Sequence, residues 1–233
     1  MFNFIRKIDL WDACDKGYLE ELKSKNISYQ LKSAQDLAIY QLVRELKDLD
    51  IAEIGGGSSR ILERLAQNNR CANIEKFEGR DLGPKGPVAL QNVRNISTYV
   101  GDFDPQLPDA SFDLVFSISV VEHVETPKLD AFFLDSLRIL RPGGRFIHAI
   151  DIYVEDEPGR YMVDRFERYR AWLGVTSQVR PIGAVYSGPL RFATDMASNP
   201  DNILYGWNSL VPSLSDVRTR SQNVSLLVGA MKL

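Results

Sequence analysis

This chain has few cysteines and histidines, no excess of basic residues and no long hydrophobic run. Its two cysteines, Cys14 and Cys71, have no metal-ligand spacing, which indicates free thiols in a reducing compartment. A formal net charge of −3 argues against a general attraction to nucleic acid or to an anionic membrane. No apolar run approaches the roughly 20 residues that span a bilayer, and residues 1–10 are already charged, unlike a secretory signal. We therefore expect a cytoplasmic protein whose partners include neither nucleic acid nor membrane.

Size and composition fit one globular domain with an additional segment attached to it. The 233 residues are 44% hydrophobic and 25% charged, which allows a substantial core. Residues 1 to about 48 have helical character, and Ser33-Ala-Gln-Asp36 is typical of a capping box ahead of an apolar helical pattern. We therefore expect helices before the first strand.

The stretch that organises the chain is Ile-Ala-Glu-Ile-Gly-Gly-Gly-Ser-Ser-Arg at residues 51–60. β-favouring residues, three glycines and a helix-compatible segment predict a strand, a tight turn and a helix. Glycines let a ligand lie against bare backbone at a helix N-terminus. The carboxylate of Glu53 would repel a pyrophosphate but suits a ligand that carries an ammonium or hydroxyls. Such turns also close ordinary strand–helix junctions and dinucleotide sites, so the turn by itself leaves the ligand open.

Three later blocks follow in order. Residues 96–103 form a β-branched segment, predicted to be a strand that ends in Gly-Asp-Phe. Residues 111–119 are apolar enough for a strand buried on both faces, and Val-Val-Glu-His-Val follows at 120–124. Residues 128–140 have helical periodicity, which Arg-Pro-Gly-Gly breaks at 141–144 before another strand at 145–151. The order indicates alternating strands and helices.

Taken together, residues 50–151 resemble class I S-adenosylmethionine-dependent methyltransferases. Glu-x-Gly-x-Gly-x-Ser is similar to that family's acidic-x-Gly-x-Gly-x-Gly motif, with Ser59 replacing the last glycine, and Leu-Arg-Pro-Gly-Gly is characteristic of the family. The resemblance implies an α/β Rossmann-like fold whose seven-stranded, mostly parallel sheet has one antiparallel strand and helices on both faces. It implies a helical cap at 1–48, a methyltransferase domain at 49–233, and an acceptor-side elaboration at 152–215.

The resemblance also implies a cofactor, S-adenosyl-L-methionine, and residues that bind it. The expected cofactor-binding residues are Glu53, Gly55, Gly56, Gly57, Glu75, Glu78, Asp102, Phe103 and Ser119. Glu53 and the glycines would hold the methionine part, while Asp102 and the Phe103 amide would face the adenine. A carboxylate about 20 residues beyond the glycines commonly accepts from the ribose hydroxyls. We prefer Glu75 for this role and keep Glu78 as the alternative. Residues 79–87 contain too many helix breakers for the usual crossover helix.

Acceptor chemistry is expected near the two histidines, His123 and His148. A hydroxyl acceptor needs a base, because an alcohol is a poor nucleophile while protonated. Our catalytic candidates are His148, Asp151 and His123. A second interpretation has His148, Asp151 and Glu122 hold a divalent metal, and a third makes both histidines structural. A spacing of three puts His148 and Asp151 on opposite faces of a strand, unless the strand ends or bends between them, so a metal is possible but not predicted.

The C-terminal third is rich in aromatics and carries arginines at 160, 165, 168 and 170. A solvated helix face is the simpler interpretation. The sharper one is an anionic acceptor, such as a nucleotide-linked sugar, held by arginine forks. We therefore expect O-methylation of a small-molecule acceptor such as a (nucleotide-)sugar. The alternatives are N- or C-methylation of another metabolite and a non-catalytic module that binds the cofactor. The sequence leaves a homodimer open.

Overall fold

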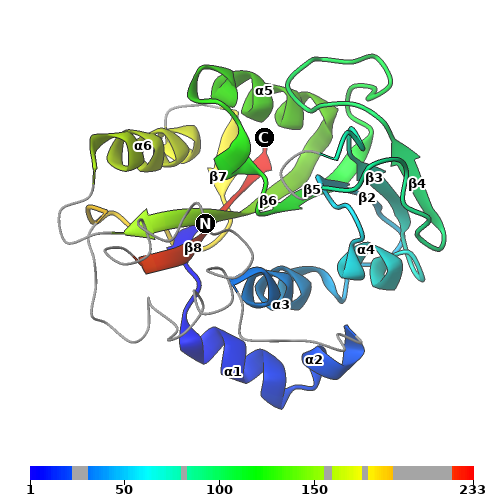
Figure 1. Ribbon diagram of the computed structural model, residues 1–233, viewed down its shortest axis with the longest axis horizontal. Coiled ribbons are helices and arrows are strands. Elements are labelled where there is room, and N and C mark those ends of the chain that lie inside the picture. Colours follow the sequence, from blue (N-terminus) through cyan, green and yellow to red (C-terminus); the bar gives the residue numbers. More distant parts are fainter. Residues whose placement is uncertain (23–30, 80–82, 155–158, 175–177, 191–221) are drawn as a thin grey trace.

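A twisted eight-stranded sheet forms the centre of the computed structural model, which describes residues 1–22, 31–79, 83–154, 159–174, 178–190 and 222–233 (Figure 1). The strands are β1 (Phe2–Phe4), β2 (Asp50–Ile54), β3 (Arg70–Ile74), β4 (Val93–Ile96), β5 (Phe112–Ile118), β6 (Leu140–Val154), β7 (Val179–Pro181) and β8 (Gln222–Lys232). Their order is β1-β8-β6-β5-β2-β3-β4, with β7 also paired to β8. Strands β2 to β6 pair in parallel, and β8 runs antiparallel to β6. The Rossmann-like fold is confirmed, with eight strands where we expected seven.

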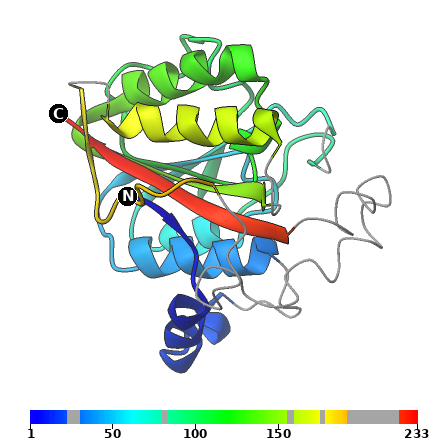
Figure 2. The ribbon, with the colours of Figure 1, turned by 90° about the vertical axis from the view of Figure 1, so that its left-hand side faces the viewer.

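Helices cover both faces of this sheet. They are α1 (Lys7–Asp15), α2 (Tyr18–Glu21), α3 (Leu31–Val43), α4 (Arg60–Leu65), α5 (Leu129–Ile139) and α6 (Arg160–Gly174), with short 3-10 helices η1 (Val121–His123) and η2 (Thr126–Lys128). Helices α3 and α4 lie on one face and α5 and α6 on the other, while α1 and α2 lie beyond α3 (Figures 1 and 2). In the part of the chain that the structure describes, no helix is long and apolar enough to cross a membrane.

Alternating side chains of the central strands pack into two separate hydrophobic cores, one on each face of the sheet. On β6, Ile147 and Ala149 join the core under α3 and α4, while Phe146 and Ile150 join the core under α5 and α6. Successive side chains of a strand point to opposite faces, so a strand covered on both sides is apolar throughout. This alternation also decides on which face each polar residue of β6 lies.

The N-terminal residues correct one expectation. Residues 2–4 form β1, which pairs antiparallel with Leu226–Val228 of β8, whereas we expected helical structure from residue 1. Phe2 is fully buried, and its ring centroid lies 5.0 Å from that of Phe166. A three-residue strand has too short a pattern to detect, and it forms because a distant partner strand completes it. The division into a cap at 1–48 and a domain at 49–233 stays a prediction.

The segment before Gly-Asp-Phe also differs from its prediction. Strand β4 ends at Ile96, and the following residues turn instead of continuing as a strand to residue 103. Gly101 has a φ of 111° and Phe103 a φ of 54°, values that no β-strand contains. The described residues between β3 and β4 contain no helix, as the breakers predicted.

Candidate active site

The glycine loop connects β2 to α4 as predicted. Gly55 and Gly57 adopt positive φ angles of 66° and 51°. A Cβ atom on Gly56 would lie 2.8 Å from Oδ1 of Asn73, which donates from Nδ2 to the Gly57 carbonyl at 3.1 Å. Since a real Cβ does not approach so closely, this position requires glycine. The loop therefore presents bare backbone at the carboxyl end of β2.

Glu53 lies directly beneath this loop and is 4% exposed. The Ser59 hydroxyl donates to the Glu53 carboxylate and accepts from the Leu62 amide at 3.0 Å, so it also caps α4. The departure from the glycine motif at residue 59 thus has a structural role. Burial raises the pKa of Glu53 to about 7. A cationic group placed here would restore the charged carboxylate.

The two ribose candidates occupy different positions after β3. Glu75 immediately follows the strand, and its Oε1 accepts from the Phe77 amide at 3.3 Å. Glu78 is exposed and accepts from the Tyr99 hydroxyl at 2.9 Å. Glu75 therefore lies closer along the chain to the strand end that borders the glycine loop. Its role in binding ribose stays a prediction.

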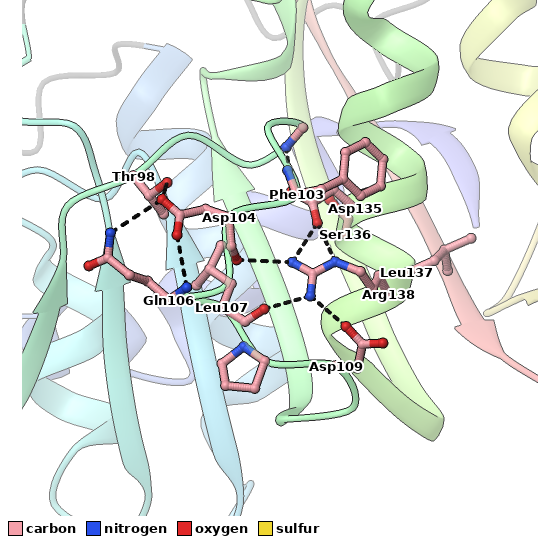
Figure 3. Close-up of polar contacts among 12 residues, drawn as sticks. Thr98, Phe103, Asp104, Gln106, Leu107, Asp109, Asp135, Ser136, Leu137 and Arg138 are labelled. Carbon is pink, nitrogen blue, oxygen red and sulfur yellow. Dashed lines mark hydrogen bonds and ion pairs between the residues drawn. The ribbon is translucent and has the colours of Figure 1, made fainter.

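The Gly-Asp-Phe turn is held by α5 (Figure 3). The fully buried Asp135 accepts from the Gly101 amide at 2.6 Å and from the Phe103 amide at 3.2 Å. Arg138 donates to Asp135 at 2.8 Å and to the carbonyl of Leu107 at 2.6 Å (Figure 3). The Phe103 amide thus has an acceptor within the fold, and its position beside the adenine stays a prediction. Asp102 is exposed beside it and keeps its predicted role.

His148 does not lie at the ligand-binding edge, which contradicts its expected role as a base. Its fully buried ring lies 5.2 Å, 5.4 Å and 5.7 Å from the rings of Phe146, Phe132 and Phe133. Its Nδ1 bonds with the Ser117 hydroxyl at 2.8 Å. Burial lowers the pKa of His148 to about 3, so the imidazole stays neutral. Strand β6 continues to Val154, which leaves His148 inside the sheet on the α5 face.

Asp151 lies on the opposite face, where polar side chains from four elements meet. Gln35 of α3 donates from Nε2 to Asp151 at 2.6 Å and to the Ser225 hydroxyl of β8 at 2.8 Å. Ser119, just after β5, donates to Oε1 of Gln35 at 2.6 Å and has a φ of 53°. Burial raises the pKa of Asp151 to about 6. Ser119 therefore follows β5, and Asp151 lies on the neighbouring strand β6, two residues beyond the last pair that β6 makes with β5.

Two residues near Asp151 complete this edge. Glu122 lies on η1, and both of its carboxyl oxygens are buried without a hydrogen-bond partner among the described residues. Burial and the neighbouring Asp151 raise the pKa of Glu122 well above its usual value. His123 is exposed on the same 3-10 helix, and its catalytic role stays a prediction. Across the described ranges, no group of three or more His, Cys, Asp or Glu side chains could hold a metal ion.

Gln35 is the site residue that sequence reasoning missed. We interpreted residues 33–36 as a capping box, but α3 already begins at Leu31 and Gln35 is fully buried within it. Asp36, the last residue of that box, is also buried and pairs with Arg60. A run of polar residues on the buried face of an apolar helix was the available signal.

The arginines of α6 have partners within the protein. Arg168 donates to Asp130 at 3.2 Å, Arg170 to Glu167 at 3.1 Å, and Arg160 lies 3.6 Å from Asp164. Arg165 is buried and donates to the backbone carbonyls of Val121 and Val124. This helix therefore gives no direct support to an anionic acceptor.

Comparison with known proteins is consistent with this geometry. Residues 52–148 match a family described as "Methyltransferase domain". The ubiquinone biosynthesis O-methyltransferase of Paramagnetospirillum magneticum is 32% identical over 114 residues, which cover 46% of this chain and 43% of that protein. The fatty-acid O-methyltransferase of Mycolicibacterium smegmatis is 30% identical over 122 residues, 51% of this chain and 40% of that protein. The chain thus spans less than half the length of these relatives.

A solved structure shows the same fold. Phosphoethanolamine N-methyltransferase 2 of Haemonchus contortus, in complex with S-adenosyl-L-methionine, superposes with a TM-score of 0.54 at 16% identity. The match covers 85% of this chain and 52% of that one.

Proposed function

We propose that this chain, whose residues 52–148 match a methyltransferase domain, transfers a methyl group from S-adenosyl-L-methionine to an oxygen of a small-molecule acceptor. The two relatives described above are O-methyltransferases, which supports oxygen as the accepting atom. The observation that carries the proposal is the position of Asp151. It lies beyond the level at which β5 ends, on the sheet face shared with Glu53 and the glycine loop.

The glycine loop fits this cofactor. Its methionine part carries an ammonium, which would pair with the buried Glu53 carboxylate and favour the charged form. The backbone at Gly56 stays bare because a Cβ there would strike Asn73. For the ribose we propose Glu75, and for the adenine we propose Asp102. Ser119, bonded to Gln35, lies between the cofactor edge and Asp151 along the strand order.

Asp151 would serve as the general base. The cofactor, when bound, supplies a methyl group on a sulfonium, so the new C–O bond forms as the C–S bond breaks and its electron pair returns to sulfur. The acceptor hydroxyl loses its proton, which Asp151 takes up. Gln35 orients the carboxylate through its 2.6 Å hydrogen bond. With its pKa raised to about 6, Asp151 is a stronger base than an ordinary carboxylate.

For the acceptor, we propose an uncharged hydroxyl, such as that of a sugar. The buried acids Glu53, Glu122 and Asp151 provide no positive charge that would pair with a carboxylate at the reacting position. If the sugar is nucleotide-linked, its phosphates have to lie away from this edge, because the described α6 arginines already pair with protein groups.

The test combines binding with turnover. Purified protein is titrated with S-adenosylhomocysteine by calorimetry and then assayed against nucleotide sugars and phenolics, with and without a chelator. We expect cofactor binding and transfer to a hydroxyl acceptor, and Asp151→Asn should keep the binding and lose the turnover. Transfer that survives this substitution would favour an N- or C-acceptor that needs no base. Binding with no transfer to any acceptor would favour a non-catalytic module, and absence of both would refute the proposal.

A further inference from the structure

Glu122 has an unusual environment for an acid. Both of its carboxyl oxygens are buried, and neither makes a hydrogen bond to the described residues, although the backbone amides of Glu122 and Asp151 lie close enough to favour its charged form. Leaving a buried polar group unpaired destabilises the fold, and more so when the group is charged. Native proteins rarely keep such a group without a reason, and one reason is a ligand that supplies the missing donor.

The charged and titratable groups around Glu122 indicate what kind of donor fits. Asp151 of β6 and Lys32 of α3 act on its carboxyl, and Tyr169 of α6 also lies within its electrostatic reach. Burial, and then Asp151, raise the pKa of Glu122 well above its usual value, while the backbone amides of Glu122 and Asp151, and then Lys32, oppose them. The uncharged carboxyl is therefore favoured, and this form can donate and accept at once. An uncharged acid matches a hydroxyl better than an ammonium.

The turn that carries Glu122 is held from α6. Arg165 donates to the carbonyls of Val121 at 2.9 Å, Val124 at 2.9 Å and Glu122 itself at 3.4 Å. The guanidinium is anchored in turn by the Tyr169 hydroxyl at 2.7 Å. A planar guanidinium can satisfy several such carbonyls together. The position of the Glu122 backbone is thus fixed by the fold.

We propose that Glu122 binds a second hydroxyl of the acceptor, next to the hydroxyl that Asp151 deprotonates. The acceptor would then contain a vicinal diol, as a sugar ring or a catechol does. This inference rests on the proposed function and assigns Glu122 a part in specificity. Asp151 takes the proton of the reacting hydroxyl, while Glu122 stays hydrogen-bonded to its neighbour and transfers no proton. Two acids beside each other match two adjacent hydroxyls.

The experiment compares matched acceptors. The kcat/KM of the protein is measured for a vicinal diol and for the analogue that lacks the second hydroxyl, using catechol with phenol and a sugar nucleotide with its deoxy form. We expect a preference for the diol of at least about 100-fold, because a site built to bond a hydroxyl is left with an unpaired group when the hydroxyl is missing. Glu122→Ala should bring this ratio close to one by lowering the diol value. Glu122→Gln, which keeps a donor and an acceptor, should retain part of the preference.

Two further measurements separate specificity from folding. Glu125→Gln removes an exposed carboxylate on the same loop and should leave the ratio unchanged. The affinities of the two acceptors for the protein saturated with S-adenosylhomocysteine, measured by calorimetry, should show the same preference without turnover. If Glu122→Ala does not fold, the diol preference of Glu122→Gln is measured instead, and it should be smaller than that of the unmodified protein.

The outcomes also distinguish this inference from the proposed function. Equal use of diol and analogue by the unmodified protein, or a ratio that Glu122 substitutions leave unchanged, would overturn the Glu122 assignment while methyl transfer stands. A protein that binds S-adenosylhomocysteine but methylates no acceptor would overturn both.

Discussion

His148 and Asp151 lie three residues apart on β6, and both side chains are buried, yet their surroundings have opposite chemistry. His148 faces α5, where phenylalanine rings pack around it and Ser117 bonds its Nδ1. Asp151 faces α3, where Gln35 donates to it and the nearby Glu122 oxygens make no hydrogen bond to the described residues. We therefore assign His148 to the core and Asp151 to the proposed acceptor site.

Burial alone does not separate the two environments. It displaces the pKa of both groups toward the uncharged form, to about 3 for His148 and to about 6 for Asp151. What differs is the kind of neighbour. Aromatic rings occupy the space around the imidazole, whereas polar side chains from several elements converge on the carboxylate at the edge of the sheet. A perturbed pKa therefore indicates a candidate site only where polar partners converge on the group.

The largest expected effect is on acid stability and comes from His148. Its pKa is about 6.5 unfolded and about 3 folded, so the unfolded chain binds the proton first as the pH falls. Stability is complete above pH 6.5 and should decrease by up to about 5 kcal/mol as the pH falls to 3. The double variant Ser117→Ala with His148→Phe should lack this decrease, which urea unfolding at a series of pH values would show. An unchanged slope would mean that His148 is solvated.

Asp151 provides the next test, because it is the residue that we place at the site. Asp151→Asn should lower kcat/KM by about 10²–10⁴-fold, the usual contribution of a general base. Affinity for S-adenosylhomocysteine should change little. The His148→Phe double variant serves as the matched control and should keep its activity within a few-fold. The reverse pattern, with His148 essential and Asp151 dispensable, would invert the assignment of core and site.

Glu53 should show a pH slope of opposite sign to that of His148. Its pKa is raised to about 7 from an ordinary value of 4.5, so the folded chain binds the proton more tightly. This contribution is present below pH 4.5 and is lost as the pH rises to 7, with an upper limit of about 3 kcal/mol. The Glu53→Gln variant should lack this pH dependence of the free energy of unfolding, measured beside the parent protein at the same series of pH values. A Glu53→Gln variant with the parent's profile would show that the carboxylate is not desolvated.

Arg165 gives the smallest effect and tests how the site is held. In Arg165→Lys, one ammonium cannot reach the carbonyls of Val121 and Val124 together, so we expect a loss of about 1–3 kcal/mol of stability. The preference for diol acceptors should decrease with it. Arg160→Lys, at an exposed position, is the control and should match the parent protein in both measurements. A retained preference in Arg165→Lys would show that Glu122 is positioned by other contacts.

Local patterns predicted the parts of the site that local structure builds. The strand, glycine turn and helix at residues 50–65 follow from residues that are neighbours in sequence, and so does the position of Glu53. The helix break before β6 likewise follows from Arg-Pro-Gly-Gly. Strand length was harder to predict: β4 ends at Ile96 because Asp135 holds the next turn, and β6 continues past His148 to Val154 because β8 pairs along it.

The sequence by itself therefore determined the fold class, the cofactor loop and the alternation that separates His148 from Asp151, because each depends on spacing within one segment. Only the tertiary structure decided which buried polar groups have partners. Gln35 reaches Asp151 across 116 positions, and Arg165 reaches Val121 across 44. Such pairings depend on how distant segments pack, and no periodicity within either segment encodes them. For that reason the cofactor loop could be predicted from the sequence, whereas the acceptor edge emerged only once the sheet was assembled.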